Sequence, residues 1–213
     1  MRGLFVSLEG GEGSGKSTQL ALLARRIEAA GRSALTTREP GGTPMGSRIR
    51  ELLVRRSDDP PAPVAELFLY AADRAHHLAT VIRPALTAAR VVLCDRYADA
   101  TEAYQGWGRG LPLDLVRAVN RMATDGLWPD RTVILDLAPR LGVERALARQ
   151  RREGGPAEVR FEAEALGFHE RVRAGYLAIA EANPDRVRVV DAGGTPEGVA
   201  EAVWNAVEDL FER

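Results

Sequence analysis

The segment LEGGEGSGKST, residues 8–18, combines the residue types that can hold a chain of phosphates. Gly10, four further residues and then Gly15-Lys16-Ser17 match the P-loop pattern. Glycines let backbone N–H groups curl around phosphate oxygens, and a helix starting directly after the loop adds a positive partial charge. Lys16 can reach the β and γ phosphates, and the Ser17 hydroxyl can ligate Mg²⁺. The predicted nucleoside-triphosphate-binding residues are Gly10, Gly11, Glu12, Gly13, Ser14, Gly15, Lys16, Ser17 and Thr18.

Two residues of this loop are unusual for this chain. Lys16 is the only lysine among 29 basic residues, so arginine is the default cation and a lone arginine says little about anion binding. Glu12 places a carboxylate where phosphates are expected, and like charges repel. We therefore expect Glu12 either to point into solvent or to contact something other than the bound phosphates.

Carboxylates at strand ends are the candidates for the metal site. Asp95 ends the strand predicted over 91–97, and Asp136 lies in the strand predicted over 132–139. Either carboxylate can approach Mg²⁺ directly or through water. We favour Asp95, together with Ser17, because the neighbouring Arg96 supplies the positive charge that phosphoryl transfer also needs.

The elements that position these residues alternate between short apolar runs and longer helical patterns, which is typical of βα units around a parallel sheet. We predict an α/β, three-layer fold of the P-loop NTPase type, with a five-stranded parallel sheet flanked by helices. The five strands are expected at 4–10, 33–40, 91–97, 132–139 and 187–192. Helices are expected at 17–31, 45–56, from the break at 58–63 to about 89, in an arginine-rich segment before 152–158, from there to about 183, and at 196–211. In such sheets ligands bind outside the carboxyl ends of the strands.

The composition limits the remaining possibilities. A length of 213 residues favours a single domain, 1–213. The net charge of −1 gives no support for nucleic acid as a partner, and the absence of a long apolar run gives none for a membrane. A single cysteine and no secretory pattern favour a cytoplasmic protein.

Four further clusters complete a recognisable set: REPGGTP (38–44), LYAADRAHH (69–77), CDRYADATEAYQG (94–106) and RALARQRR (145–152). Together with the P-loop they resemble thymidylate kinases, the P-loop enzymes that transfer the γ-phosphoryl group of ATP to dTMP and give dTDP for dTTP synthesis. The resemblance continues to GFHERVRAGYLAIA (167–180) and so covers nearly the whole chain. It implies ATP and dTMP as substrates, Mg²⁺ as cofactor and a homodimer.

The resemblance also implies which residues bind dTMP. Arg38 and Arg96 match the arginines that hold its phosphate, since a planar guanidinium suits phosphate oxygens. Glu12 matches the acidic residue that contacts the sugar 3′-hydroxyl. The residues that match the base site are Tyr70 for stacking on thymine, usually a phenylalanine, Arg74 for a thymine carbonyl, and Thr101 and Gln105 for the base edge. Ala100 departs from the family, which usually has serine there.

The segment of about 141–160 matches the family's mobile lid. The loop lacks an arginine, so the resemblance implies that a lid arginine neutralises charge on the transferred group. Arg145, Arg149, Arg151 and Arg152 are the candidates. We favour Arg149, followed by Arg151, as catalytic residues beside Lys16 and Arg96.

Two other functions fit parts of the pattern. A kinase for another nucleoside monophosphate or a deoxynucleoside is opposed by Glu12, Tyr70, Arg74 and Gln105 together. A nucleotide-dependent switch would bind ATP or GTP without an acceptor, and the chain has no NKxD guanine motif. His76, His77 and His169 show no metal-binding spacing.

Overall fold

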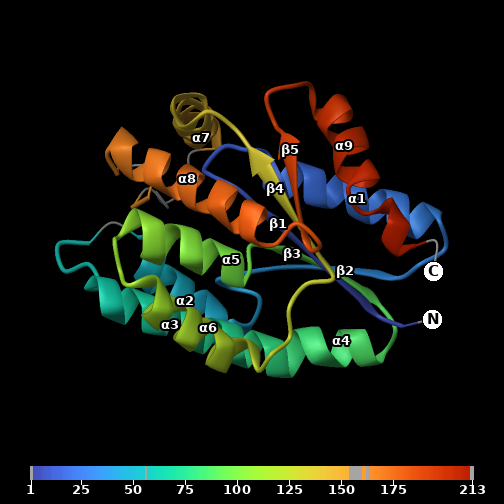
Figure 1. Ribbon diagram of the computed structural model, residues 1–213, viewed down its shortest axis with the longest axis horizontal. Helices are drawn as coiled ribbons and strands as arrows, with labels where there is room; N and C mark the ends of the chain where they lie inside the picture. Colours follow the sequence, from blue (N-terminus) through green and yellow to red (C-terminus); the bar gives the residue numbers. More distant parts are fainter. Residues whose placement is uncertain (1, 56, 154–159, 162–163, 212–213) are drawn as a thin grey trace.

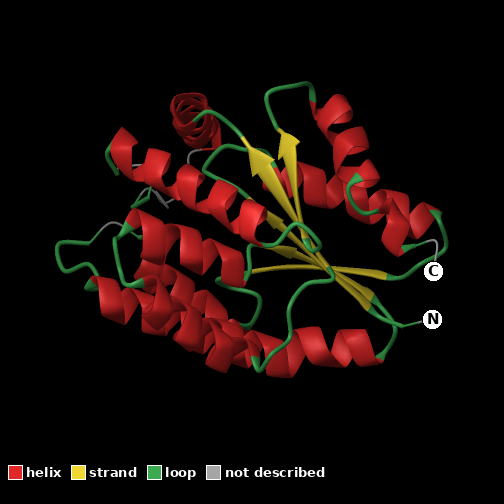
Figure 2. Cartoon of the chain, viewed as in Figure 1, coloured by secondary structure: helices red, strands yellow, loops and turns green. Residues whose placement is uncertain are grey.

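The computed structural model describes residues 2–55, 57–153, 160–161 and 164–211. A central sheet is covered by helices on both faces (Figure 1; Figure 2). The described strands are β1 (Leu4–Glu9), β2 (Ala34–Arg38), β3 (Val91–Asp95), β4 (Arg131–Asp136) and β5 (Val187–Asp191). All their pairings are parallel, in the order β2-β3-β1-β4-β5. The predicted fold class and its five strands are therefore confirmed.

Helices connect these strands and complete the chain after β5. In chain order they are α1 (Lys16–Ala29), α2 (Pro44–Val54), α3 (Pro63–His77), the π-helical η1 (Leu78–Ile82), α4 (Arg83–Thr87), α5 (Ala98–Thr101), the π-helical η2 (Glu102–Gly108), α6 (Leu113–Thr124), α7 (Pro139–Glu153), α8 (Leu166–Ala182), α9 (Pro196–Asn205) and the 3₁₀ turn η3 (Glu208–Leu210).

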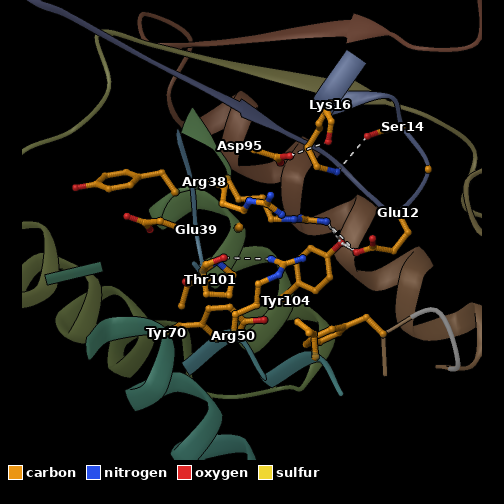
Figure 3. A pocket seen from close by; sticks show the side chains of 18 of the residues that line it. Glu12, Ser14, Lys16, Arg38, Glu39, Arg50, Tyr70, Asp95, Thr101 and Tyr104 are labelled. Carbon is orange, nitrogen blue, oxygen red and sulfur yellow. Dashed lines mark hydrogen bonds and ion pairs between the residues drawn. The ribbon is translucent and has the colours of Figure 1, made fainter. Parts of the chain in front are cut away.

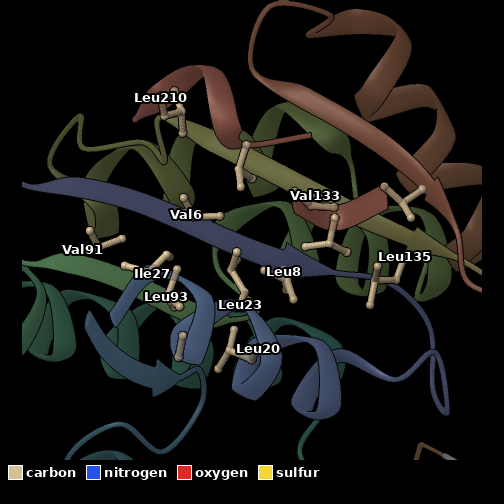
Figure 4. Close-up of a cluster of buried hydrophobic side chains, with 14 of the residues drawn as sticks. Val6, Leu8, Leu20, Leu23, Ile27, Val91, Leu93, Val133, Leu135 and Leu210 are labelled. Atoms are coloured by element: carbon tan, nitrogen blue, oxygen red, sulfur yellow. The ribbon is translucent and has the colours of Figure 1, made fainter. Parts of the chain in front are cut away.

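Apolar residues alternate between the two faces of the sheet. Leu4, Val6 and Leu8 of β1 face a cluster that includes residues of α1 and α9 (Figure 4). Phe5, between them, points to the opposite face and packs with residues of η1 and α4. Farther along that second face, Ile134 packs with residues of η2 and α8. The three central strands, β1, β3 and β4, are buried on both sides, as their continuous apolar sequences predict, whereas the edge strands β2 and β5 are partly exposed.

The predicted helix from residue 63 to about 89 is a continuous helical segment with a local change of pitch. It passes from α3 through the π-turn η1 into α4. Pro84 has no N–H to donate to the preceding turn, and a widened turn directly before it accommodates the missing hydrogen bond. The last helix ends at Asn205, earlier than predicted, and is followed by η3.

Two helices begin with the same local device. Thr43 caps α2, because its Oγ1 accepts a hydrogen bond from Gly46 N at 2.8 Å, and Pro44 follows it. Thr195 caps α9 in the same way. A hydroxyl cap followed by proline suits the first turn of a helix, where N–H groups lack partners. In REPGGTP the Thr43 cap and Pro44 fix where the loop after β2 ends and α2 begins.

The lid predicted over 141–160 begins within α7, and its expected tip, Gly154-Gly155-Pro156, lies outside the described residues. In the part of the chain that the structure describes, no helix is long and apolar enough to cross a bilayer.

Candidate active site

The strand register brings three predicted site segments to one edge of the sheet. Leu8 of β1 lies opposite Asp95 of β3, and Asp95 lies opposite Arg38 of β2. The P-loop follows β1 directly, so it emerges beside both. The order of these strands in the sheet differs from their order in the chain. In open α/β sheets, ligands bind at the carboxyl ends of the strands where such a change of order occurs.

A cavity of about 440 Å³ opens at this edge (Figure 3). Every residue predicted to bind dTMP lines it, as do the P-loop residues from Glu12 to Thr18. Gly10 and Gly11 instead border a small hollow on the side of β4 and α8. The remaining residues lining the large cavity are Glu39, Pro40, Arg50, Val54, Asp95, Tyr97, Ala100, Tyr104, Arg149 and Phe161.

Lys16 lies folded back on its own loop. Its Nζ donates to the carbonyl oxygens of Gly10 and Gly11, at 3.1 and 2.9 Å. Burial and the positive charge of Arg96 lower the pKa of Lys16 to about 8, despite the opposing effect of Asp95. The ammonium is thus held by weak neutral acceptors, which a phosphate oxygen can replace as a stronger, charged partner.

The loop is pressed against the start of α7. A Cβ placed on Gly13 would lie 2.0 Å from the carbonyl oxygen of Gly142, and one on Gly142 would lie 2.3 Å from the carbonyl oxygen of Glu12. Gly13 also has a φ of 64°, which glycine adopts without strain. Two glycines are therefore needed for the loop and α7 to approach this closely.

The structure separates the two candidate metal carboxylates. Ser17 Oγ donates to Asp95 Oδ2 at 3.2 Å, so a hydroxyl and a carboxylate oxygen lie side by side at the loop. Asp136 instead accepts two hydrogen bonds from Arg173, at 2.7 and 2.8 Å. Ser17 and Asp95 fit the hard oxygen ligands that Mg²⁺ prefers. The described residues contain no cluster of three or more His, Cys, Asp or Glu side chains suited to a metal.

Glu12 makes an ion pair with Arg96 inside the cavity wall. Arg96 Nη2 donates to Glu12 Oε1 at 2.8 Å, and Tyr104 Oη donates to the same oxygen at 2.7 Å. Both charged side chains are 17% exposed. Burial alone would raise the pKa of Glu12, but Arg96 and Lys16 outweigh it and lower the pKa to about 2. Glu12 is therefore an ionised acceptor at the cavity and does not point into bulk solvent.

Arg96 is held from several sides. Its Nη1 donates to Tyr176 Oη at 3.1 Å, and its backbone has a φ of 69°, rare for a residue with a side chain. The next residue, Tyr97, donates its N–H to Glu9 Oε1 at 2.7 Å, and Tyr176 Oη donates to Glu9 Oε2 at 3.0 Å. Burial, followed by the negative charge of Asp99, raises the pKa of Glu9 to about 8. These contacts fix the turn that directs Arg96 into the cavity.

The far end of the cavity carries the predicted base-binding residues. Tyr70 is half-buried there, and a second ring that the sequence analysis did not identify, Phe161, also lines the cavity. Thr101 and Gln105 are 1% exposed. Arg74, also 1% exposed, uses four of its five N–H groups inside the protein, toward Glu39, Asn120, Tyr97 and Thr101. At most one of its N–H groups is left for a base, so Arg74 chiefly holds this wall together.

The arginines of α7 are not equivalent. Arg149 and Arg151 are both exposed, but only Arg149 lines the cavity. Arg145 Nη1 donates to the carbonyl oxygen of Ala192, 3.3 Å away on the side of β5. Arg38 is exposed, and it lines the same cavity as Arg96.

Several lining residues were missed by sequence reasoning. Tyr104 lies within the AYQG segment, and the π-turn η2 directs its side chain toward Glu12. Arg50 and Phe161 come from segments far away in the chain. Ala100, which replaces the family serine, does line the cavity.

The parallel sheet, the P-loop at its switch point and an adjoining cavity for a second substrate define a phosphotransferase of the nucleoside monophosphate kinase class. Residues 8–203 match the family model described as thymidylate kinase. The chain belongs to the thymidylate kinase family, as its motifs predicted, and is an ATP:dTMP phosphotransferase.

Known relatives agree over the full length. The chain is 53% identical to a thymidylate kinase of Solidesulfovibrio magneticus over 98% of this chain and 100% of the relative. It is 52% identical to one of Nitratidesulfovibrio vulgaris, over 98% and 97%. The crystal structure of thymidylate kinase from Ehrlichia chaffeensis superposes with a TM-score of 0.76 at 31% identity, covering 97% of this chain and 99% of that one.

Proposed function

We propose that dTMP occupies the 440 Å³ cavity, with its phosphate toward Arg38 and Arg96 and its base between Tyr70, Thr101 and Gln105, and that ATP lies on the P-loop. One observation carries this proposal: the residues that the sequence motifs assign to dTMP come from separate segments, yet they line one cavity that is continuous with the loop. Tyr70 offers a ring for stacking, a contact worth roughly 1–3 kcal/mol per base.

Glu12 is the residue that recognises the sugar in this arrangement. Its carboxylate is ionised and already accepts hydrogen bonds from Arg96 and Tyr104. Burial raises the pKa of Tyr104 well above its usual value, so the phenol keeps its proton and goes on donating. The carboxylate has free acceptor capacity for the 3′-hydroxyl. The loop thus serves both substrates: its backbone and Lys16 hold ATP, and one of its side chains holds dTMP.

Phosphoryl transfer then depends on position and charge. The second pKa of a phosphate monoester is about 6, so the dTMP phosphate is ionised near neutral pH and needs no strong general base. Lys16, Arg96 and Arg149 all line the cavity, which supports a role for the first two in holding the phosphates in line and for Arg149 in adding a positive charge from α7. Mg²⁺, when held by Ser17 and Asp95, would neutralise charge on the β and γ phosphates.

The lid belongs to the same proposal. The segment 141–160 starts where α7 meets the P-loop at Gly142, within the single domain 1–213. Closure of such a segment over ATP would exclude water and suppress hydrolysis.

A homodimer is also part of the proposal. The neighbouring helices α2, α3 and α6 expose large apolar side chains, namely Leu52, Val64, Phe68, Leu115 and Met122. Exposed apolar groups on adjoining elements are typical of protein interfaces. Sedimentation of the native chain should give a dimer, and Phe68→Glu should shift it toward monomer; a native monomer at micromolar concentration would contradict this part.

The whole proposal is tested by ADP release with Mg²⁺, ATP and each of dTMP, dUMP, dCMP, dGMP, AMP and thymidine. We expect turnover with dTMP far above the others. Equal ADP release without any acceptor would instead indicate an ATPase or a switch, and equal rates with several monophosphates would contradict the assignment of the base site.

A further inference from the structure

Glu66 is a buried carboxylate that no substrate in the proposed arrangement contacts. It lies in the first turn of α3 and is 0% exposed. A carboxylate can be buried only when charged or polar groups surround it. Its partners are therefore informative about what it does.

Three side chains converge on this carboxylate. Gln105 Nε2 donates to Oε1 at 2.7 Å. Arg109 Nε donates to the same oxygen at 3.2 Å, and Arg160 Nη2 lies 2.6 Å from Oε2. The amide NH₂ and both guanidinium groups can only donate in these contacts, so both oxygens of Glu66 act as acceptors.

A carboxylate whose oxygens already accept from two guanidinium groups is an acceptor for any further partner as well. A side-chain amide has one donating end and one accepting end, so Glu66 can bind Gln105 only through its NH₂ group. The orientation of the Gln105 amide is therefore set by Glu66. The carbonyl oxygen is the end that remains for the cavity, which Gln105 lines.

This orientation distinguishes pyrimidines by what they carry at N3. Thymine and uracil carry a hydrogen there, which a carbonyl oxygen accepts. Cytosine carries a lone pair at N3, which a carbonyl oxygen repels and to which an amide NH₂ would donate. The 5-methyl group, which distinguishes thymine from uracil, plays no part in this contact.

We propose that Glu66 is a positioning residue for substrate specificity, an inference that rests on the proposed binding of dTMP in this cavity. Glu66 fixes the orientation of the Gln105 amide, so that the amide carbonyl selects bases with an N3–H and rejects cytosine.

Glu66 also connects the Gln105 amide to the end of the lid segment, through Arg160. Arg160 donates through Nη1 to the carbonyl oxygen of Leu53 at 2.9 Å, and the adjacent Phe161 lines the cavity. Arg109 bridges from Glu66 to Glu164, which lies 2.5 Å from its Nη1. One carboxylate thus holds both the base-reading amide and the chain on which the second ring of the base site is mounted.

Glu66→Gln tests the proposal because it keeps the shape and lets either end of the Gln105 amide face residue 66. The measurement is kcat/KM for dTMP, dUMP and dCMP. We expect the dTMP to dCMP ratio to fall at least about tenfold, since a buried polar contact of this kind carries such discrimination. The dTMP to dUMP ratio should stay unchanged, because both bases carry N3–H.

Two further variants make the outcome unambiguous. Glu164→Gln removes a carboxylate from Arg109 without touching Gln105 and should leave both ratios at the native values. Glu66→Asp keeps the negative charge beside both arginines while withdrawing it from Gln105, so it should shift the dCMP ratio in the same direction even if Glu66→Gln folds poorly.

Equal losses for all three nucleotides in both Glu66 variants would overturn the inference and leave Glu66 a purely structural residue. If the native enzyme itself fails to prefer dTMP over dCMP, the base site of the proposed function is wrong. A native preference that both Glu66 variants retain would refute only the role of Glu66.

Discussion

Arg96 Nη2 and Glu12 Oε1 lie 2.8 Å apart, so the arginine assigned to the dTMP phosphate is paired with the carboxylate assigned to its sugar. Each charge compensates for the burial of the other in a wall that is largely removed from solvent. In the proposed arrangement the pair orients two contacts to one substrate, one to each end of the same nucleotide sugar. Neither side chain has to be ordered anew when dTMP arrives, which lowers the entropic cost of binding.

Glu12→Ala should lower kcat/KM for dTMP about 10²-fold, since the loss of a hydrogen bond to a charged group is worth about 1.5–3 kcal/mol. The sharper measurement compares dTMP with its 3′-deoxy analogue. The native enzyme should prefer dTMP, and Glu12→Ala should treat the two nearly alike. If the variant retains the native preference, Glu12 does not contact the 3′-hydroxyl.

Asp95→Asn should raise the Mg²⁺ concentration needed for half-maximal activity at least about tenfold, because it removes a charged oxygen ligand beside Ser17. The matched control is Asp136→Asn, whose carboxylate is occupied by Arg173. The control should leave the Mg²⁺ dependence at its native value. The opposite pattern would assign the metal to the end of β4.

Arg149→Ala should reduce kcat about 10²-fold or more, as expected when a cation near the transferred group is lost. Arg151→Ala, which removes an exposed side chain outside the cavity lining, should change kcat by no more than a few-fold. Single-turnover measurements with saturating substrates separate this effect from binding. Equal effects of the two variants would count against Arg149 as the catalytic cation.

The pH profile should report on Lys16, whose pKa in the unliganded cavity is lowered to about 8 by burial and Arg96. Above this pH the free enzyme loses the ammonium that pairs with phosphates, so kcat/KM for ATP should fall. Bound phosphates favour the charged form, so kcat should persist to higher pH. A kcat that falls at the same pH as kcat/KM would contradict this role of Lys16.

Glu9 should give the fold an unusual pH dependence. Its pKa is about 8 when folded, chiefly through burial, against a usual value of 4.5. Between these pH values the folded chain holds a proton that the unfolded chain has released, so stability from this residue falls as pH rises. Glu9→Gln removes the titration, and its Tm should rise relative to the native Tm between pH 5 and pH 8. A constant difference in Tm over that range would show that Glu9 stays ionised.

The sequence was sufficient for features that depend on local pattern. The P-loop glycines, the apolar strands and the charged residues at strand ends are each encoded within a few positions, and parallel strands bring their ends together in any arrangement. The neighbouring Arg96 favours Asp95 over Asp136 in the sequence, and Ser17 does lie beside Asp95 in the fold.

Partnerships between distant segments could not be predicted in this way. Glu66 and Arg160 are 94 positions apart, and in sequence each is one charge among many. The π-turn η2 directs Tyr104 to Glu12, and its widened pitch has no simple apolar signature. Arg74 resembles a base-binding residue, yet most of its N–H groups are used within the protein, because hydrogen-bond partners come from three separate segments.

The contact between Gly13 and Gly142 gives α7 a point on the P-loop about which the helix can tilt. Arg149 lies seven residues beyond Gly142, which at 1.5 Å per residue is a distance of roughly 10 Å along the helix axis. A tilt of about 10° would carry its backbone roughly 2 Å along an arc, on the scale of one hydrogen bond made or broken. Because neither glycine carries a side chain, the backbones of the P-loop and α7 meet directly, so in the proposed arrangement a loop that shifted on binding ATP would tilt α7 and move Arg149 with it.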